Sequence, residues 1–226
     1  MNVLAIETAT SGCAVGVRAG TGLELTRVVP GERHHNEVLV QGMADLLSQA
    51  KLSPQSIDRV VVDHGPGLFT GLRVGIATAI AFAQGVGADL VEVSSLELLA
   101  HGARRDGIAG HFDALVDARR GELFVQSFEL GDDVAAVTAP FIARPEELVA
   151  SWREHPLKER FVGGDGATRY AQLLTPLATK VLVDLTMPPI LEALRLGVTR
   201  GPVLTVTPQY LRDADAVVNF ATRERP

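Results

Sequence analysis

The residues best suited to chemistry gather in a turn near the start of the chain. In the stretch IETATSGCAVGV an apolar run ends at Glu7, and Thr8, Thr10 and Ser11 follow before a second apolar run begins. A turn of this kind can collect backbone N–H groups into a concavity that binds an anion such as phosphate. Glu7, Thr8, Thr10 and Ser11 are therefore candidates for a nucleotide-binding turn, although a polar hairpin turn without a ligand explains the same pattern.

A second charged turn lies near the middle of the chain. The stretch VDARRGE places Asp117, Arg119, Arg120 and Glu122 around an Arg-Gly pair, with a strand-like run on each side. This pattern predicts a β-hairpin. Asp117 is a further candidate for a nucleotide site, and the charged turn could form a binding edge. A solvated hairpin tip is an equally good interpretation.

A glycine-rich stretch, GPGLFTGLRVGIATAIAFAQG, looks like a phosphate-binding loop that runs into a helix. It lacks the lysine of the P-loop motif. Its first three glycines, Gly65, Gly67 and Gly71, are spaced as GxGxxxG and not as the GxGxxG of dinucleotide-binding turns. The stretch therefore matches neither nucleotide motif, although a helix N-terminus behind glycines can still bind an anion.

The same helix carries small residues four positions apart, at Gly71, Gly75, Ala79 and Ala83. A glycine inside a helix costs roughly 0.8 to 1 kcal/mol relative to alanine, so this row needs a compensating contact. Close approach of another backbone is the usual compensation. The spacing does not decide whether that backbone belongs to this chain or to another molecule.

The histidines and the single cysteine do not show a spacing typical of a metal site or a catalytic nucleophile. His34 and His35 are adjacent, and the sequence contains neither HxxxH nor HExxH. Cys13 has no second thiol, and no serine lies in a GxSxG motif. We therefore expect no metal site and expect Cys13 to be a core residue.

The composition is that of a folded globular protein, with 226 residues of which 46% are hydrophobic and 21% are charged. The net charge is −6 and no block of Lys and Arg is present, so we expect no binding of nucleic acid without a partner. The start of the chain lacks the basic segment of a signal peptide, and no long apolar run reads as a membrane span. We expect a cytoplasmic protein with no membrane partner.

The hydrophobic patterns predict strands before helices twice, which indicates two α/β lobes. The first series has three strands up to about residue 29, a helix from 36 to 51, a strand ending at 63, the glycine-rich helix and a strand up to 95. The second has the hairpin, a helix from 145, a strand from 160, a helix over 168–178 and a helix ending near 197. We place the lobes at 1–107 and 108–226, and leave open whether the tail after 203 packs on the first lobe.

Six stretches of the sequence resemble the motifs of one protein family and occur in the same order. They are LAIETATSGCAVGV, GPGLFTGLRVGIATAIAFAQG, VSSLELLA, LVDARRGELF, GGDGA and TPQYLR. The family is TsaB, also called YeaZ, and the resemblance covers nearly the whole chain. It implies a two-lobe, actin-like α/β fold of the ASKHA, ribonuclease-H-like type, with mixed sheets flanked by helices.

The resemblance also implies a role in forming threonylcarbamoyladenosine in tRNA. In that pathway the paralogue TsaD is the catalytic, metal-binding subunit, TsaB is its non-catalytic partner, and the ATPase TsaE acts on the pair. The implied partners are thus a TsaD-type paralogue and a TsaE-type ATPase, with a homodimer in their absence and with tRNA contacted only through the complex. No cofactor is assigned to this chain alone, and ATP or ADP at the subunit interface is left open.

Two positions can be compared with the paralogue and the family. The catalytic paralogue has an HxxxH metal motif where this chain has ERHHNEVLVQG, and the residues four after His34 and His35 are Val38 and Leu39. The metal pair is therefore absent. Family members usually carry Asp at the end of the first strand, where this chain has Glu7, which makes nucleotide hydrolysis by this chain alone still less expected.

In the family, the helices that match 36–51 and 71–85 form the surface that joins TsaB to TsaD or to a second copy of itself. On this basis we expect the small-residue row to admit a partner's helix. The expected interface consists of Leu39, Met43, Leu68, Phe69, Gly71, Leu72, Arg73, Gly75, Ile76 and Ala79.

Three other functions are compatible with parts of the sequence. An autonomous ATPase or small-molecule kinase of the ASKHA type would use the turn from Thr8 to Gly12 and the stretch VGGDGA. A metalloprotease would need the missing histidine pair. A homodimeric scaffold without a role in tRNA modification would use only the small-residue helix.

Overall fold

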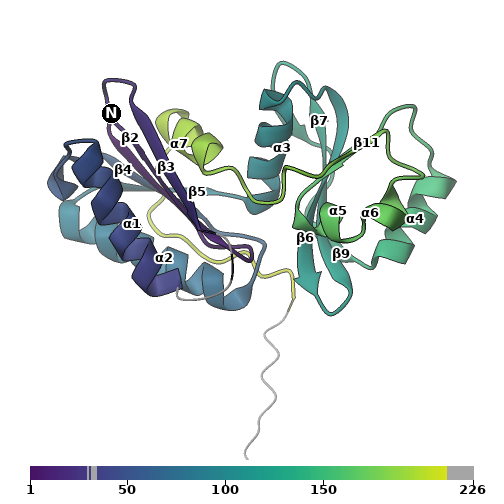
Figure 1. Ribbon diagram of the computed structural model, residues 1–226, viewed down its shortest axis with the longest axis horizontal. Coiled ribbons are helices and arrows are strands. Elements are labelled where there is room, and N and C mark those ends of the chain that lie inside the picture. Colours follow the sequence, from purple (N-terminus) through teal and green to yellow (C-terminus); the bar gives the residue numbers. More distant parts are fainter. Residues whose placement is uncertain (30, 32–34, 213–226) are drawn as a thin grey trace, which may run out of the picture.

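The computed structural model describes residues 1–29, 31 and 35–212, which form two lobes side by side (Figure 1). The first lobe is built on a sheet of strands in the order β3-β2-β1-β4-β5. Strand β2 is antiparallel to β1 and β3, whereas β4 and β5 run parallel to β1. The strands are β1 (Val3–Glu7), β2 (Cys13–Arg18), β3 (Glu24–Val29), β4 (Arg59–Asp63) and β5 (Asp89–Val93).

The second sheet repeats this arrangement in the order β11-β10-β6-β7-β8, with β9 also paired to β7. Strand β7 is antiparallel to β6, and β10 and β11 run parallel to β6. These strands are β6 (Gly110–Arg119), β7 (Glu122–Leu130), β8 (Val134–Ala136), β9 (Phe141–Ala143), β10 (Phe161–Gly163) and β11 (Lys180–Leu182). Two lobes with this repeated order make up the actin-like, ribonuclease-H-like fold predicted from the sequence.

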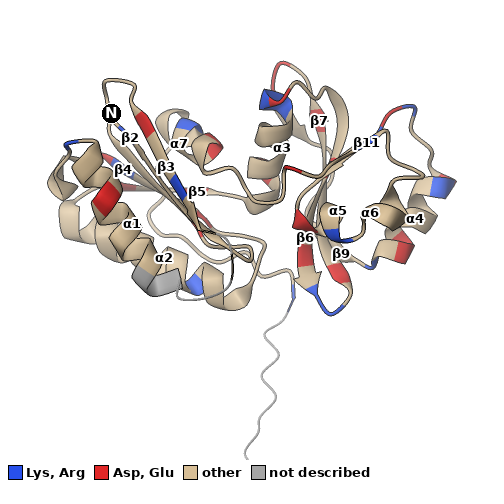
Figure 2. Ribbon diagram, viewed as in Figure 1, with Lys and Arg blue, Asp and Glu red and all other residues tan. Residues whose placement is uncertain are grey.

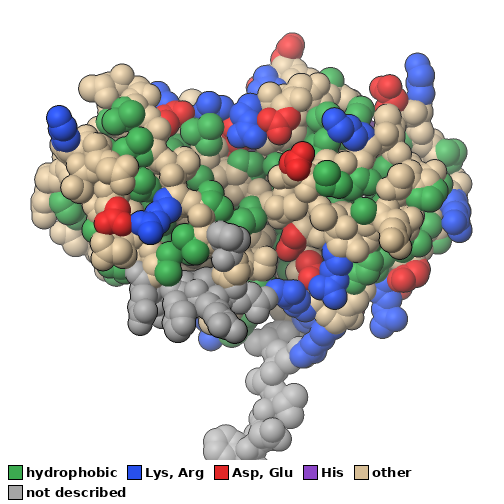
Figure 3. Space-filling model, viewed as in Figure 1, with side chains coloured by type: hydrophobic (Ala, Val, Ile, Leu, Met, Phe, Trp, Pro, Cys, Tyr) green, Lys and Arg blue, Asp and Glu red, His purple; other side chains and the backbone are tan. Residues whose placement is uncertain are grey.

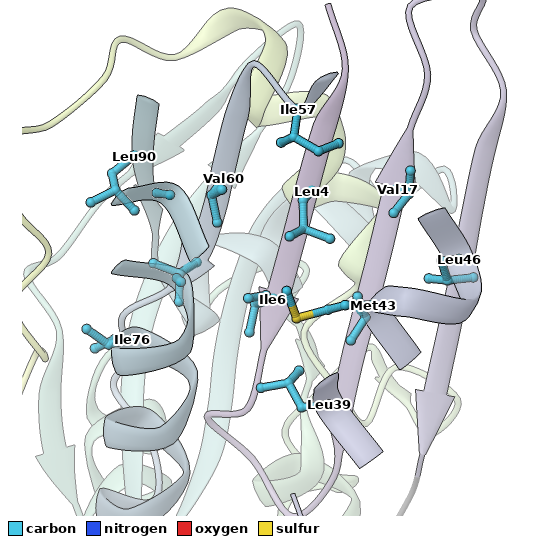
Figure 4. Close-up of a cluster of buried hydrophobic side chains, with 14 of the residues drawn as sticks. Leu4, Ile6, Val17, Leu39, Met43, Leu46, Ile57, Val60, Ile76 and Leu90 are labelled. Atoms are coloured by element: carbon cyan, nitrogen blue, oxygen red, sulfur yellow. The ribbon is translucent and has the colours of Figure 1, made fainter. Parts of the chain in front are cut away.

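The helices cover both faces of the two sheets. They are α1 (His35–Gln49), α2 (Phe69–Val86), α3 (Ser95–Arg105), α4 (Pro145–Glu154), α5 (Asp165–Arg169), α6 (Ala171–Leu174) and α7 (Ile190–Thr199), with a 3₁₀ turn at Pro54–Ser56. On one face of the first sheet, α1 and α2 bury a continuous apolar cluster against the strands (Figure 4). Strand residues Leu4, Ile6 and Val60 meet Leu39, Met43, Leu46 and Ile76 there.

The two lobes exchange their last helices. Helix α3 follows β5 of the first sheet, but Leu96 and Leu99 pack with Phe112 of the second. Helix α7 follows β11 of the second sheet, but Ile190 and Leu194 pack against the first. A boundary between residues 107 and 108 therefore separates the strands of the two sheets along the chain. It does not separate the two hydrophobic cores, because α3 precedes it and packs on the second sheet, whereas α7 follows it and packs on the first.

The chain after α7 returns to the first lobe and then reaches the second. Val203 forms a bridge with Leu90, and the Gln209 N–H donates to the His64 carbonyl at 2.8 Å. Arg212 then forms an ion pair with Glu122 of the second-lobe hairpin. This answers the question that the sequence left open about the tail, as far as residue 212.

The small-residue row of α2 faces the protein's own core, so its assignment to a partner contact is wrong. A Cβ atom on Gly75 would lie 2.1 Å from Thr8 Oγ1, and Thr8 Oγ1 itself donates to the Gly71 carbonyl at 2.8 Å. The close approach that compensates for the glycines is therefore made to the turn after β1. Seven residues of the expected interface are buried within the chain: Leu39, Met43, Gly71, Leu72, Gly75, Ile76 and Ala79.

Helix α2 is also long and apolar enough to cross a membrane by length and composition alone, although Arg73 interrupts its apolar residues. Its buried face packs on the first sheet, and a core helix of a soluble protein passes the same test. Several elements were not predicted. They include α3 and the short strands β8, β9 and β11, while the helix expected over 168–178 is two short helices, α5 and α6.

Candidate functional site

The turn after β1 is organised around the Glu7 carboxylate. Glu7 is fully buried, and its Oε1 accepts the backbone N–H of Ala9 at 2.8 Å and that of Thr10 at 3.3 Å. The amides that could have bound a phosphate thus point at the protein's own carboxylate. The structure brings Glu7, Thr8 and Thr10 together in this turn, and Ser11 lies half-buried beside them.

A second buried carboxylate ends the neighbouring strand. Ile6 of β1 is in register with Val62 of β4, so Glu7 and Asp63 follow at adjacent strand ends. Asp63 accepts hydrogen bonds from the Gly65 N–H and from Ser95 Oγ, each at 2.8 Å. It thereby joins the turn before α2 to the start of α3. Asp63 was not among the residues predicted for the site, although a lone carboxylate at the end of the run RVVVD was a usable signal.

Both carboxylates have raised pKa values. Burial, followed by the charge of Asp63, raises the pKa of Glu7 well above its ordinary value. Burial also raises the pKa of Asp63 to about 7, although the Gly65 and Ser95 hydrogen bonds oppose it. At neutral pH a protonated, uncharged form of the pair is therefore accessible. Carboxylates that bind a cation have lowered pKa values instead and stay ionised.

The glycine-rich turn is locked onto the same β1 turn. The Leu68 N–H donates to the Ala9 carbonyl at 2.7 Å, and a Cβ atom on Gly67 would lie 2.2 Å from that oxygen. Glycine at position 67 is thus required by the close approach of two backbones. The turn holds α2 against β1 with backbone contacts and not with a ligand.

The second lobe has a corresponding pair of carboxylates. Asp117 lies near the end of β6, the strand that takes the place of β1 in the second sheet, and its backbone N–H donates to Asp165 Oδ1 at 2.9 Å. Asp117 Oδ2 forms ion pairs with Arg169 at 2.9 Å and Arg119 at 3.3 Å. Burial, followed by the Asp117 charge, raises the pKa of Asp165. Asp165 was also missed, although it stands in the motif GGDGA.

Among the residues that the structure describes, no group of three or more His, Cys, Asp or Glu side chains could hold a metal ion. His34 lies outside the described residues, and so does the side chain of His35. Cys13 is buried in the core, as expected from the sequence.

Three residues of the expected interface do reach the surface or its edge. Leu68 is half-buried, and Phe69 and Arg73 are exposed at the start of α2. The Phe69 ring stacks on Tyr210 of the tail with centroids 5.1 Å apart, and the Arg73 guanidinium lies 3.7 Å from the Phe69 centroid. Arg73 Nε also donates to the Tyr210 hydroxyl at 3.0 Å.

Comparison with known proteins gives consistent results. The model of the family described as TsaD, tRNA N6-adenosine threonylcarbamoyltransferase, matches residues 28–185. The chain is 32% identical to the tRNA threonylcarbamoyladenosine biosynthesis protein TsaB of Escherichia coli K12 over 162 residues, which is 67% of this chain and 69% of that protein. It is 27% identical to Bacillus subtilis TsaB over the whole of both chains.

A solved structure from Pseudomonas aeruginosa, described as an uncharacterized protein with similarity to peptidase YeaZ, superposes with a TM-score of 0.80. It is 25% identical and covers 93% of this chain and 99% of its own. A second structure, YeaZ from Pseudomonas aeruginosa, has a TM-score of 0.76. The chain therefore belongs to the TsaB (YeaZ) family, whose members are named for tRNA threonylcarbamoyladenosine biosynthesis.

Proposed function

We propose that this chain is a cytoplasmic, non-catalytic partner subunit in tRNA threonylcarbamoyladenosine biosynthesis. It docks to a TsaD-type catalytic paralogue, a TsaE-type ATPase acts on the pair, and tRNA is contacted only through the complex. In the absence of the paralogue the same docking surface joins two copies of this chain.

The observation that carries the non-catalytic part of this proposal is the self-occupied turn after β1. An active phosphate-binding turn would offer its amides to the ligand and an ionised carboxylate to a metal-bound water. Here the Ala9 and Thr10 amides donate to Glu7, which is buried and has a raised pKa. A phosphate in that position would have to displace the Glu7 carboxyl group from these amides.

We assign the docking surface to the outward side of α2, because the small-residue row points into the core. Phe69, Arg73 and Ala77 are exposed and lie at successive turns of the helix. Aromatic and arginine side chains are the residues most often responsible for affinity at protein interfaces. The exposed small side chain of Ala77 leaves room beside them for a partner's helix.

Complementation of a depleted strain tests the proposal. Depletion of this protein is expected to abolish threonylcarbamoyladenosine in tRNA, as measured by nucleoside mass spectrometry. The Glu7→Gln variant is expected to restore the modification to the wild-type level, because the carboxylate's charge has no catalytic task. Loss of the modification in a folded Glu7→Gln protein would contradict the non-catalytic role, and no change on depletion would contradict the pathway itself.

A further inference from the structure

A group of arginines surrounds the β6–β7 turn of the second lobe, where the tail arrives from the first lobe. This arginine edge is formed by Arg119 and Arg120 of the turn, Arg169 at the end of α5, and Arg212 of the tail. Arg169 pairs with Asp117 at 2.9 Å, while Arg212 pairs with Glu122. Figure 2 shows Lys and Arg at the β6–β7 turn and on α5, and Figure 3 shows blue side chains gathered over this region with red ones among them.

The turn holds two arginines in a left-handed backbone conformation that residues other than glycine rarely adopt. A register shift between Asp117 and Arg119 marks a β-bulge, and Arg119 and Arg120 have φ values of 62° and 55°, followed by Gly121 at 78°. Asn or Gly is preferred at such positions, and a side chain such as arginine costs about 1 kcal/mol or more at each. Bulges and left-handed residues of this kind commonly serve to aim side chains. Two arginines held at this cost indicate a use for their charge.

The charges of the edge are layered. Asp117 beneath the turn is only 6% exposed, whereas the side chains of Arg119 and Arg169 are 40% and 54% exposed. The pKa of the neighbouring Asp165 is raised by burial, which favours its neutral form. The guanidinium groups of Arg119 and Arg169 are therefore more exposed than the Asp117 carboxylate that pairs with both. These exposed arginines gather on a chain whose net charge is −6.

We infer that the arginine edge binds the phosphate backbone of the RNA substrate when this chain is part of its complex. The inference rests on the proposed function and gives the chain a substrate-positioning task within it. Planar guanidinium groups bind phosphate oxygens in pairs, and contacts to the backbone position an RNA without reading its sequence.

An extended RNA fits the edge better than a free nucleotide does. The four arginines come from a hairpin, a short helix and the tail, so they are spread over three elements of the surface. Two amides of the turn are already used within the chain, since the Arg119 N–H donates to Asp117 at 3.0 Å and the Asp117 N–H donates to Asp165 at 2.9 Å. The positive charges of the arginines lie along the surface, where an extended RNA backbone could contact them, and not inside an enclosed turn.

Substitution of Arg120 provides a test in which folding is preserved. Asn tolerates the left-handed conformation, so Arg120→Asn should keep or slightly raise the melting temperature. The complex of this chain with its TsaD-type paralogue would be titrated with unmodified tRNA transcript over a range of KCl concentrations. Arg120→Asn is expected to weaken binding about three- to tenfold near 0.1 M salt and to flatten the slope of log K against log salt by about 0.7 to 0.9.

A second variant and a control complete the experiment. Arg120→Asn with Arg169→Gln should flatten the slope by roughly twice as much, whereas Arg153→Gln, at an exposed position on α4, should leave it unchanged. An unchanged affinity and slope in the double variant, with the complex intact on gel filtration, would overturn the inference. Loss of ATP binding with RNA affinity unchanged would overturn it as well. Failure of the wild-type complex to form would instead contradict the proposed function on which the inference rests.

Discussion

Glu7 and Asp63 end neighbouring parallel strands, and each is buried among hydrogen-bond donors of its own turn. The Glu7 side chain folds back onto the Ala9 and Thr10 amides. The sequence alone placed Glu7 in a polar turn. It could not show that the turn's donors would be used internally, because that depends on the side-chain rotamer and on the adjacent strand.

The buried pair should make stability depend on pH. The folded pKa of Asp63 is raised from 3.8 to about 7 and that of Glu7 is raised too, so both contributions are fully present in acid. They are lost as pH rises through the folded pKa values. The free energy of unfolding, measured by urea denaturation, is expected to fall between about pH 4 and pH 8 from this pair. Glu7→Gln should reduce that fall, and an identical pH profile in the variant would contradict the assignment.

Asp113 and Arg160 form a buried ion pair in the second lobe. Arg160 donates to Asp113 at 2.6 Å, Ser127 Oγ and His111 also contact the carboxylate, and the guanidinium lies 4.3 Å from the Trp152 ring centroid. Asp113→Ala would leave Arg160 buried without its counter-charge.

We expect Asp113→Ala to lower the free energy of unfolding by roughly 3 to 5 kcal/mol. The control Asp132→Ala, at an exposed position, should change it by less than about 0.5 kcal/mol. Chemical denaturation of both variants measures the difference. Equal stabilities would show that the ion pair contributes nothing beyond its own desolvation cost.

Helix α2 illustrates what an element's pattern can and cannot predict. The glycine and alanine spacing correctly indicated a close backbone approach, since Gly75 lies against Thr8. It could not say which surface approaches, because the same steric rule holds within a chain and between chains. The strands around Glu7 and the hairpin at Arg120-Gly121 were predictable, since alternation and turn residues are local signals. The exchange of α3 and α7 depends on tertiary packing alone and left no local signal.

Gly75→Leu should destabilise the fold and not merely weaken docking. The added side chain would displace Thr8 and separate α2 from β1, because its Cβ alone lies 2.1 Å from Thr8 Oγ1. We expect a loss of about 2 kcal/mol or more in the free energy of unfolding.

Gly85 in the same helix provides the control, because a Cβ there meets no atom within 4 Å. Gly85→Ala should raise stability by up to about 1 kcal/mol through helix propensity. Thermal melts compare the two. A Gly75→Leu protein as stable as wild type would contradict the inward packing of the row.

At the scale of the whole molecule, the exchanged helices and the returning tail tie the two lobes together. Helix α3 contributes to the core of the second sheet and α7 to that of the first, and residues 203–212 run from Leu90 to Glu122 (Figure 1). One side of this assembly offers the outward face of α2, and the second-lobe hairpin offers the arginine edge. We assign partner docking to the outward face of α2 and RNA binding to the arginine edge.

The affinity for a TsaD-type paralogue, measured by isothermal titration calorimetry, tests the central claim most directly. Ala77→Glu places a charge on the exposed face of α2, and Ala135→Glu places the same charge on an exposed position of β8 as a control. The wild type and the control should bind with the same dissociation constant, and Ala77→Glu should bind at least tenfold more weakly, which corresponds to about 1.4 kcal/mol. Equal binding by Ala77→Glu, or no binding by the wild type, would contradict the account.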